Sequence, residues 1–481
     1  MSDKNKIGWN FDNSYSNLPK SFIYEISPVP VKHPELVILN YDLADKMGLD
    51  FSNIDNKELA KIFSGNSLPK GAKSIAQAYA GHQFGHFTML GDGRAVLLGE
   101  HISKNNQRLD VQFKGSGQTP FSRNGDGRAA LGPMLREYLM SEALYSLNIP
   151  TTRSLAVVKT GENVIREKPL PGAILTRVAS SHIRVGTFQF IRTRENLEEL
   201  NTLVDYTITR HFPEISRSKN KAYDLLNKLI DKQIELVVNW MRVGFIHGVM
   251  NTDNMAISGE TIDYGPCAFM DSYNLGTCFS SIDHMGRYAY GNQPAITKWN
   301  LARFAECLLA LINPKKDEAL KIATEIIDKF DKQYEKKWFV MMKNKLGLIG
   351  DDKKDKLLIF ELLELMKELK LDYTNTFCFL MRQKFKDKKD LQNEKFNNWR
   401  IKWQKRLSKD SDKLMEYNNP VIIPRNHNVE NVLKSAENND LKPFNDLLEA
   451  LKNPYTNQKD LSKYQSPPPK SDKKYQTFCG T

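Results

Sequence analysis

The sequence has few cysteines and no long apolar run. Its five cysteines are Cys267, Cys278, Cys307, Cys378 and Cys479. None forms a CxxC pair, so we expect no structural zinc site. An odd number of widely spaced cysteines is typical of proteins from a reducing compartment. No stretch approaches 18 uninterrupted apolar residues, so we expect no membrane span.

The N-terminus lacks the features of a targeting segment. The first twenty residues, MSDKNKIGWNFDNSYSNLPK, contain no apolar run and no arginine, and they include acids. A secretory signal requires an apolar run, and a mitochondrial transit peptide is rich in arginine and poor in acids. We therefore expect a cytoplasmic protein.

The sequence also lacks the signatures of nucleic-acid binding. The net charge of +12 favours anionic partners. However, lysines alternate with acids along most of the chain, and there is no zinc finger, aromatic RNA-binding motif or compact basic block. We therefore expect a nucleotide or an acidic protein face as partner, with no nucleic acid and no membrane.

What the sequence does contain is a strand-rich half followed by a helical half. Segments such as RAVLLGEHI, RLDVQFKG and GAILTRVA have strand character. One helix interrupts them, because Leu131, Leu135 and Leu139 recur at helical spacing. From about 195 the periodicity is helical, and an apolar stripe from Leu226 to Met241 ends just before Gly244.

Three short segments predict tight turns. GDG at 91–93 lies between two strand patterns, which suggests a hairpin. AVVKTGENVIRE suggests a second hairpin with TGEN at its tip, and MAISGETI a third with SGE at its turn.

The stretch HGVMNTDN, followed by DYG, is similar to the catalytic loop of protein kinases. Its His247 and Asn254 match the ends of the pattern HRDxxxxN, and Asp263 of DYG matches the acid of DFG. Hard cations prefer oxygen ligands, so Asn254 and Asp263 are expected to bind Mg²⁺, or Mn²⁺ in its place. The alternative is a polar loop with a chance DYG.

The same loop lacks the acid that kinases use as catalytic base, because Val249 stands at that position. Asp253, directly before Asn254, is the evident substitute and could accept the proton of a hydroxyl group. It could instead be a second metal ligand or a helix cap.

Lys114 ends a strand, and Glu137 follows 23 residues later on the predicted helix. In kinase-like folds a strand lysine holds phosphates and a helical glutamate fixes its position. The alternative is a surface lysine.

Glycines and arginines supply further candidates for binding phosphate. Gly91, Gly93 and Arg94 form one cluster, because glycine backbone can approach a ligand closely. A second cluster, with Asp126 and Gly127, leads into the predicted helix. The simpler alternatives are a hairpin turn and a capped connector.

Two arginines and two histidines complete the candidates. Arg177 and Arg184 follow the last strand pattern, and guanidinium groups bind phosphate well; the alternative is a pair of surface arginines. His82 and His86, if on one strand, would lie about 13 Å apart, too far for one metal ion, and we interpret them as structural.

The order of these segments predicts an α+β chain with a two-lobed, protein-kinase-like fold and N- and C-terminal extensions. We expect an N-terminal extension at 1–75, a strand-rich N-lobe at 76–190 and a helical C-lobe at 191–400. Residues 401–481 would form a helical extension and a tail rich in proline and lysine.

The chain resembles the selenoprotein O family, whose members have a kinase fold. The resemblance rests on YAGHQFGHF, GDGRAVLLGE, DVQFKGSGQTPFSRNGDGRAALGPMLREYLMSEAL, LTRVASSHIRVGTFQF, HGVMNTDNM, DYGPCAFMD and GRYAYGNQP. It implies a protein adenylyltransferase that moves AMP from ATP to Ser, Thr or Tyr hydroxyls of proteins and releases pyrophosphate. The nucleotide would be reversed relative to ordinary kinases.

The resemblance also implies roles for residues. Asp253 would be the catalytic base, Asn254 and Asp263 the Mg²⁺ ligands, and Glu137 the partner of Lys114. ATP would be bound by Gly91, Gly93, Arg94, Lys114, Asp126, Gly127, Arg177, Arg184 and Asp263.

Family members can also bridge a C-terminal cysteine or selenocysteine to the loop after DYG. Here that implies a redox pair of Cys479 with Cys278, or with Cys267 as the second choice.

Two other functions stay open. One is a kinase-like transfer of the γ-phosphoryl group, against which Val249 counts. The other is an inactive nucleotide-binding scaffold, against which Lys114, Asn254 and Asp263 count. We expect protein substrates and a monomer.

Overall fold

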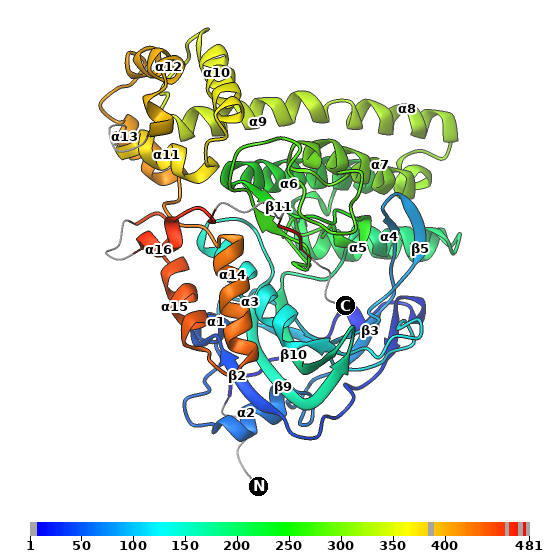
Figure 1. The fold of residues 1–481 in the computed structure, drawn as a ribbon. Coiled ribbons are helices and arrows are strands. Elements are labelled where there is room, and N and C mark those ends of the chain that lie inside the picture. Colours follow the sequence, from blue (N-terminus) through cyan, green and yellow to red (C-terminus); the bar gives the residue numbers. More distant parts are fainter. Residues whose placement is uncertain (1–6, 383–388, 457–460, 470–474, 478–481) are drawn as a thin grey trace.

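A β-sheet lobe and a helical lobe lie against each other in the chain (Figure 1). The structure is a computed structural model that describes residues 7–382, 389–456, 461–469 and 475–477. The sheet lobe comes from the first part of the sequence and the helical lobe from the middle. Among the described residues, no helix is long and apolar enough to cross a membrane.

The main sheet has eight antiparallel strands in the order β1-β3-β6-β7-β10-β9-β2, with β8 paired to β10. Both strands at the ends of this order, β1 and β2, come from the first 75 residues. The N-terminal segment is therefore built into the sheet. The strands are β1 (Ile23–Glu25), β2 (Glu35–Leu39), β3 (Ile75–Gln77), β6 (Ala95–Ile102), β7 (Arg108–Lys114), β8 (Ala129–Ala130), β9 (Arg153–Ile165) and β10 (Pro169–Ala179).

Alternating side chains send the two faces of this sheet into different cores, as the two-residue period of a strand requires. Leu97 and Val157 pack into the core that contains α3 (Leu131–Ser146). Their neighbours Leu98 and Val158 pack into a second core under α1 (Tyr41–Met47) and α2 (Asn56–Phe63). The helix predicted from Leu131 is confirmed as α3.

The helical lobe is built around α6 (Lys221–Val243), which buries the predicted apolar stripe. Gly244 ends it with a left-handed backbone (φ 74°), a conformation that glycine adopts at little cost. The other elements here are α4 (Val185–Arg192), α5 (Leu197–His211), β11 (Phe245–Ile246), β12 (Ala268–Phe269), α7 (Gln293–Ile312), α8 (Lys316–Ile327) and α9 (Phe330–Lys345).

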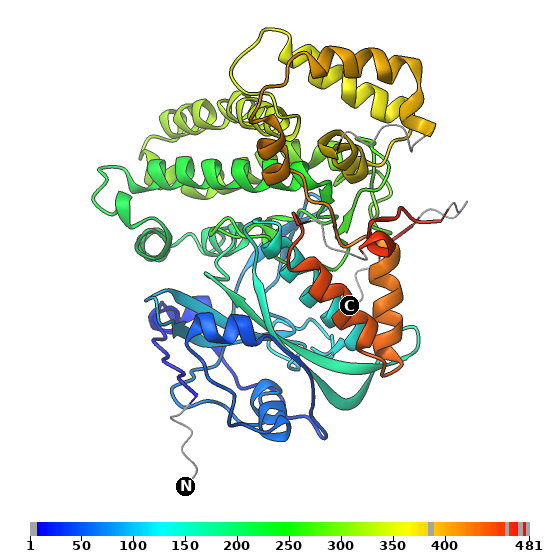
Figure 2. The same ribbon diagram turned by 90° about the vertical axis from the view of Figure 1, so that its left-hand side faces the viewer.

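The C-terminal part of the chain returns to the sheet lobe. Helices α14 (Asn426–Glu437) and α15 (Lys442–Leu451) pack against α3, as Figures 1 and 2 show. The remaining helices are α10 (Asp355–Glu368), α11 (Tyr373–Arg382), α12 (Glu394–Gln404), α13 (Ser411–Asn418) and α16 (Ser462–Gln465).

All three predicted hairpins are wrong in their pairing. GDG at 91–93 joins β5 (His86–Met89) to β6, but β5 pairs with β4 (Ala80–Gln83). The segment around TGEN lies inside the single long strand β9, whose hairpin partner is β10. The SGE turn exists, but its flanks Ala256 and Thr261 bridge to Arg184 and Thr151. In each case, partners distant in sequence displaced the local pairing.

These lobes confirm the predicted α+β, kinase-like arrangement. A strand lysine, a helical glutamate and the DYG segment meet where the two lobes join.

Candidate active site

A cavity of about 650 Å³ lies between the lobes. It is lined by every sequence-predicted residue of the nucleotide and metal sites, and also by Val249. Seven cationic and four anionic side chains line it, so its net charge is positive. The predicted lining residues are Gly91, Gly93, Arg94, Lys114, Asp126, Gly127, Arg177, Arg184, Asp253, Asn254 and Asp263.

A buried charge network fixes the lysine of this cavity. Lys114 Nζ donates to Glu137 Oε2 (2.7 Å) and to Asp263 Oδ1 (2.9 Å). The other oxygen of Glu137 accepts from Arg177 Nε (2.7 Å). Lys114, Glu137 and Arg177 come from β7, α3 and β10, and all three are at least 94% buried. The predicted Lys114–Glu137 contact is therefore present. Arg177, expected just past the last strand, instead lies within β10, because that strand extends to Ala179, and it belongs to the same network.

Asp263 is held ionised in this network. Burial opposes its charge, but Lys114, Arg94 and Arg177 outweigh that effect and hold the pKa of Asp263 well below its ordinary value. Its backbone has a left-handed conformation (φ 67°), which is uncommon for a residue other than glycine. Such strain at a cavity wall is typical of functional positions.

The loop that carries Val249 and Asn254 is fixed by buried contacts. His247 Nε2 donates to the carbonyl oxygen of Ile262 (2.9 Å), which joins this loop to the DYG segment. Asn254 Nδ2 donates to the carbonyl oxygen of Val249 (3.1 Å). The amide nitrogen of Asn254 is thus used within the loop, and its oxygen has no hydrogen bond to any described residue.

Asp253 lies in a buried position with an unpaired oxygen. Its side-chain Oδ1 is inaccessible to solvent and has no hydrogen-bond partner among the described residues. Burial raises the pKa of Asp253 to about 6, against the effect of the nearby Arg184. A carboxylate with this pKa is mostly ionised at pH 7 and can still accept a proton.

Two neighbours hold Asp253 in place. Arg184 Nη1 donates to its backbone oxygen (3.2 Å). On the other side is Gly81 of β4, where a Cβ atom would lie only 2.2 Å from Asp253 Oδ1. Only glycine leaves room for the carboxylate there. This glycine was not predicted, because the sequence gives no sign that β4 contacts the loop.

The two glycine clusters pack against each other. Thr119 Oγ1 donates to the carbonyl oxygen of Asp92 (2.7 Å), which connects the second cluster to GDG. Gly127 has φ 65°, and a Cβ on it would meet the carbonyl of Gly117 at 2.1 Å. Asp126 forms an ion pair with Arg166 (2.8 Å) at the cavity edge.

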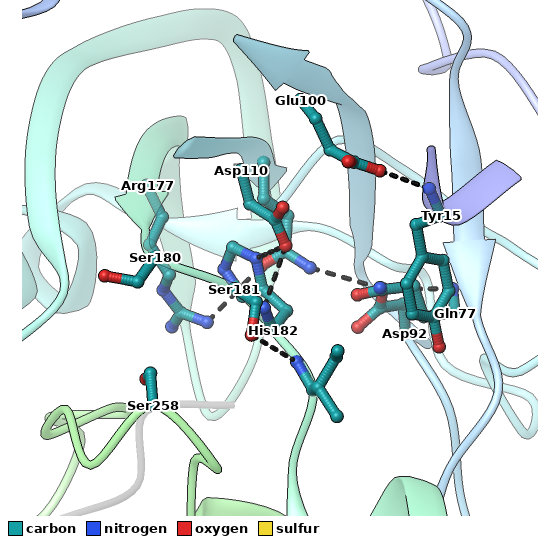
Figure 3. Close-up of polar contacts among 12 residues, drawn as sticks. Tyr15, Gln77, Asp92, Glu100, Asp110, Arg177, Ser180, Ser181, His182 and Ser258 are labelled. Carbon is teal, nitrogen blue, oxygen red and sulfur yellow. Dashed lines mark hydrogen bonds and ion pairs between the residues drawn. The ribbon is translucent and has the colours of Figure 1, made fainter. Parts of the chain in front are cut away.

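Polar residues that sequence reasoning missed form the back of the cavity. Asp92 accepts hydrogen bonds from the backbone of Gln77 (3.1 Å) and from Gln112 Nε2 (3.2 Å), as Figure 3 shows in part. Gln112 Oε1 in turn accepts from Arg177 (3.4 Å). Tyr79 lies beneath Arg184, whose guanidinium carbon is 4.3 Å from the ring centre. Asp92 stands inside the GDG motif, which was its only signal.

The oxygen groups present fit a divalent cation. The free amide oxygen of Asn254 and the second carboxylate oxygen of Asp263 line the same cavity and accept no hydrogen bond from the described residues. Hard cations use such oxygens together with phosphate and water. Within the described ranges there is no group of three His, Cys, Asp or Glu residues that could hold a metal alone.

The histidines of GHQFGH lie on two strands, not one. His82 is on β4, opposite Phe87, and His86 is on β5, opposite Gln83, so the predicted single strand is wrong. The ring nitrogen Nδ1 of His82 is hydrogen-bonded to Gln189 Nε2 (2.7 Å), and the backbone N–H of His82 donates to Thr252 Oγ1 (2.7 Å). The hairpin is thereby attached to the loop of residues 247–254.

The cysteines of the predicted redox pair are only partly described. Cys479 lies outside the described residues. Cys278 is half-buried, with its thiol 3.3 Å from Asp283 Oδ2. Cys267 is fully buried, and burial raises the pKa of its thiol to about 12, which disfavours the reactive thiolate. Thr477 bridges Ser280, so the end of the described tail lies beside the loop of Cys278.

Comparisons with known proteins place the whole chain among nucleotidyltransferases. Residues 6–452 match the family described as "Protein adenylyltransferase SelO". A relative named "Protein nucleotidyltransferase YdiU" from Pelagibacter ubique (strain HTCC1062) is 64% identical, over 99% of this chain and all of the relative. The protein of that name from Bacillus thuringiensis (strain Al Hakam) is 55% identical over the full length of both chains.

Among solved structures, the chain is similar to ROP2 from Toxoplasma gondii, described as a virulence factor with a protein-kinase fold and no enzymatic activity. The match has 9% identity and a TM-score of 0.27, over 68% of this chain and 86% of ROP2. At that TM-score it supports no conclusion about this chain.

The match over residues 6–452, the full-length relatives and the geometry of the cavity lead to one conclusion. The chain belongs to the protein adenylyltransferase SelO family, a family of nucleotidyltransferases.

Proposed function

We propose that this chain transfers AMP from ATP to a Ser, Thr or Tyr hydroxyl of a protein and releases pyrophosphate. The observation that carries the proposal is the buried carboxylate of Asp253, which has one oxygen without a hydrogen-bond partner among the described residues. Asp253 lines the same cavity as the Lys114–Asp263 ion pair. The proposed base, Asp253, and the proposed phosphate-binding cation, Lys114, thus line the same cavity.

In this reaction the acceptor oxygen attacks the α-phosphorus of ATP. A new bond forms between that oxygen and phosphorus, and the bond from phosphorus to the bridging oxygen breaks, so the electron pair leaves with pyrophosphate. The hydroxyl proton passes to the Asp253 carboxylate. The apolar side chain of Val249 offers no group that could accept it.

Mg²⁺, when bound, would neutralise phosphate charge during the transfer. The oxygens of Asn254 and Asp263 would hold it, with Mn²⁺ as an alternative. Lys114 is already fixed by Glu137, so it can contact phosphate without further ordering.

The buried cations suit a nucleotide whose β- and γ-phosphates enter first. Arg177 and Arg184 are 4% and 5% exposed, so they face the inner part of the cavity and not solvent. Buried guanidinium groups stabilise phosphate charge more strongly than exposed ones. This supports the reversed orientation, with Gly91, Gly93, Arg94, Asp126 and Gly127 as further contacts.

ATP labelled separately at the α- and γ-positions tests the proposal with a protein extract as acceptor. Only α-label should become attached to protein, and Asp253→Ala should lower this transfer about 10²–10⁴-fold. Attachment of γ-label would establish a kinase, and an Asp253→Ala variant with unchanged transfer would remove the assigned base. A parallel assay with α-labelled UTP identifies the preferred donor.

The redox pair remains a prediction. Cys278 is the better candidate partner of Cys479, because its thiol is less buried than that of Cys267. Mass spectrometry of the oxidised protein would identify the bridge. Equal transfer rates with and without reductant would show that it does not regulate activity.

A further inference from the structure

A second groove adjoins the nucleotide cavity and shares Phe84 and Ile282 with it. Its volume is about 610 Å³. One wall comes from the β4–β5 turn, and the others come from the loop after DYG and the start of α7. The lining residues are Phe84, Ile282, Asp283, His284, Met285, Arg287, Asn292, Ala295 and Ile296.

The groove is attached to the catalytic loop. Asn251, two residues before Asp253, accepts at its Oδ1 from the backbone N–H of Phe84 (3.1 Å) and from the hydroxyl of Tyr288 (2.7 Å). The rings of Phe84 and Tyr288 pack with centres 5.1 Å apart. The inner wall of the groove therefore has a fixed position relative to Asp253.

The groove exposes large apolar side chains. Met285 is 92% exposed and Ile282 is 51% exposed, although both are apolar. Clustered exposed apolar side chains beside a functional cavity are typical of a surface that another molecule covers. Covering one such side chain is worth about tenfold in binding.

The charge of the groove is positive at one side. The carboxylate of Asp283 is already bonded to the backbone N–H groups of Arg287 (2.9 Å) and Tyr288 (2.8 Å). The Arg287 guanidinium stacks on the ring of Trp299 at 4.9 Å and forms no ion pair with any carboxylate of the described residues. An acidic side chain in the groove would provide that charge partner.

The protein that accepts AMP must itself lie close to this groove. A Ser or Thr hydroxyl lies within a few ångströms of its own backbone, and residues two positions away in an extended segment lie only about 7 Å further on. A protein that presents its hydroxyl to Asp253 must therefore lay neighbouring residues beside the cavity mouth.

We propose that this groove binds the polypeptide segment of the acceptor protein that flanks the modified hydroxyl. It would take an extended segment with a large apolar residue within three positions of the acceptor residue and an acidic residue near it. The inference rests on the proposed function, because it needs a protein acceptor at Asp253.

Synthetic peptides with a single serine test the groove. Leucine is placed in turn at each position from three before to three after the serine, in an alanine background that carries one glutamate. With leucine at one of these positions, kcat/KM should exceed that of the peptide without leucine about tenfold. Replacing the glutamate by lysine should lower it about threefold, and Arg287→Gln should abolish that charge preference.

Met285→Glu should remove the leucine advantage without changing the KM for ATP, and Met285→Leu should retain it. Because Met285 is almost fully exposed, these substitutions leave no cavity in the core. Leu357→Glu on α10 is the matched control, since Leu357 is also exposed (61%) but lies outside the groove.

The outcomes separate the two proposals. If wild-type protein attaches no α-label to any acceptor, the proposed function fails. If it labels all peptides equally, or if Met285→Glu keeps the leucine advantage, the function stands and the groove assignment is wrong. A wild-type dimer that Met285→Glu dissociates would overturn it too, because the occupant would be a second copy of this chain.

Discussion

At the scale of single residues, the neighbours of Asp253 determine where its carboxylate lies, and its proposed role as the base depends on that position. It lies between Gly81 and Arg184, and one of its oxygens has no hydrogen-bond partner in the part of the chain that the structure describes. Its neighbour Asn254 is bonded to the backbone of Val249. Val249, at the ordinary position of the base, thus accepts a hydrogen bond through its backbone carbonyl, and the proposed acid stands four residues later.

Gly81→Ala should lower AMP transfer at least about tenfold, because the new methyl group would displace the Asp253 carboxylate. The backbone at Gly81 does not require glycine, so the loss of stability should be limited to the overpacking, about 1–3 kcal/mol, and the variant should still fold. Gly276→Ala is the control, since a Cβ there has only one neighbour, at 3.4 Å. Transfer rates and melting temperatures of both variants check this. Equal activity would show that the carboxylate position is not critical.

Asp263→Ala should abolish metal-dependent transfer, because it removes a proposed cation ligand and the partner of Lys114. The variant should fold, since the Asp263 side chain is still 24% exposed. Titration of Mn²⁺ followed by paramagnetic relaxation gives a readout independent of turnover. Wild-type Mn²⁺ affinity in the variant would contradict the metal assignment.

At the scale of elements, the charge network of the cavity depends on the packing of one helix against two strands. Strand β7 supplies Lys114, helix α3 supplies Glu137 and strand β10 supplies Arg177. The positions of these charges are set by how α3 packs on the sheet. The same helix carries Arg136, which donates to the carbonyl of Cys267 in the loop after DYG.

Glu137→Gln should lower the free energy of unfolding by about 3 kcal/mol and also weaken ATP binding, because it leaves Lys114 and Arg177 without their shared carboxylate. Glu142→Gln on the same helix breaks the Glu142–Arg153 ion pair, which does not line the cavity. This control should reduce stability alone. Denaturant unfolding and ATP titration separate the two effects. Equal ATP affinity in both variants would contradict the role of Glu137.

At the scale of the whole molecule, buried charges connect the two lobes. His182 follows the last sheet strand and donates its backbone N–H to Asp110 of β7 (2.8 Å), as Figure 3 shows. Arg210 of α5 binds the same carboxylate (2.6 Å). Burial lowers the pKa of His182 to about 4. The histidine is therefore neutral in the folded protein at pH 7.

This shift makes a testable contribution to stability. The unfolded chain binds a proton on His182 below about pH 6.5, whereas the folded chain does so only near pH 4. The contribution of neutral His182 to the free energy of unfolding is therefore complete above pH 6.5 and is lost as the pH falls toward 4. Wild type should lose stability relative to His182→Gln by about 1.4 kcal/mol per pH unit between pH 6.5 and 4.

The difference between the two proteins is the quantity to measure, by denaturant unfolding at several pH values. Asp92 has the opposite effect, since burial raises its pKa to about 6 and ionisation then disfavours the fold. Its contribution cancels in the comparison. A difference that does not change with pH would show that His182 is not neutral when folded.

The sequence by itself determined the types of residue and much of the local structure. The periodicity of α3 and α6 was sufficient, because an amphipathic helix depends on neighbours three and four residues away. The spacing from His247 to Asn254 and the following DYG was sufficient to propose the metal ligands and the displaced acid, since those residues are close in sequence.

Only the tertiary structure decided which segments pair and what lies beside Asp253. Gly81 lies against Asp253, and Tyr79 and Gln112 line the cavity, all from segments far from the 247–254 loop in sequence, so no local pattern could indicate them. The predicted hairpins were wrong for the same reason, because strand pairing is set by contacts across the whole sheet. The groove beside the cavity likewise exists only once β4 and β5 pack against the loop after DYG.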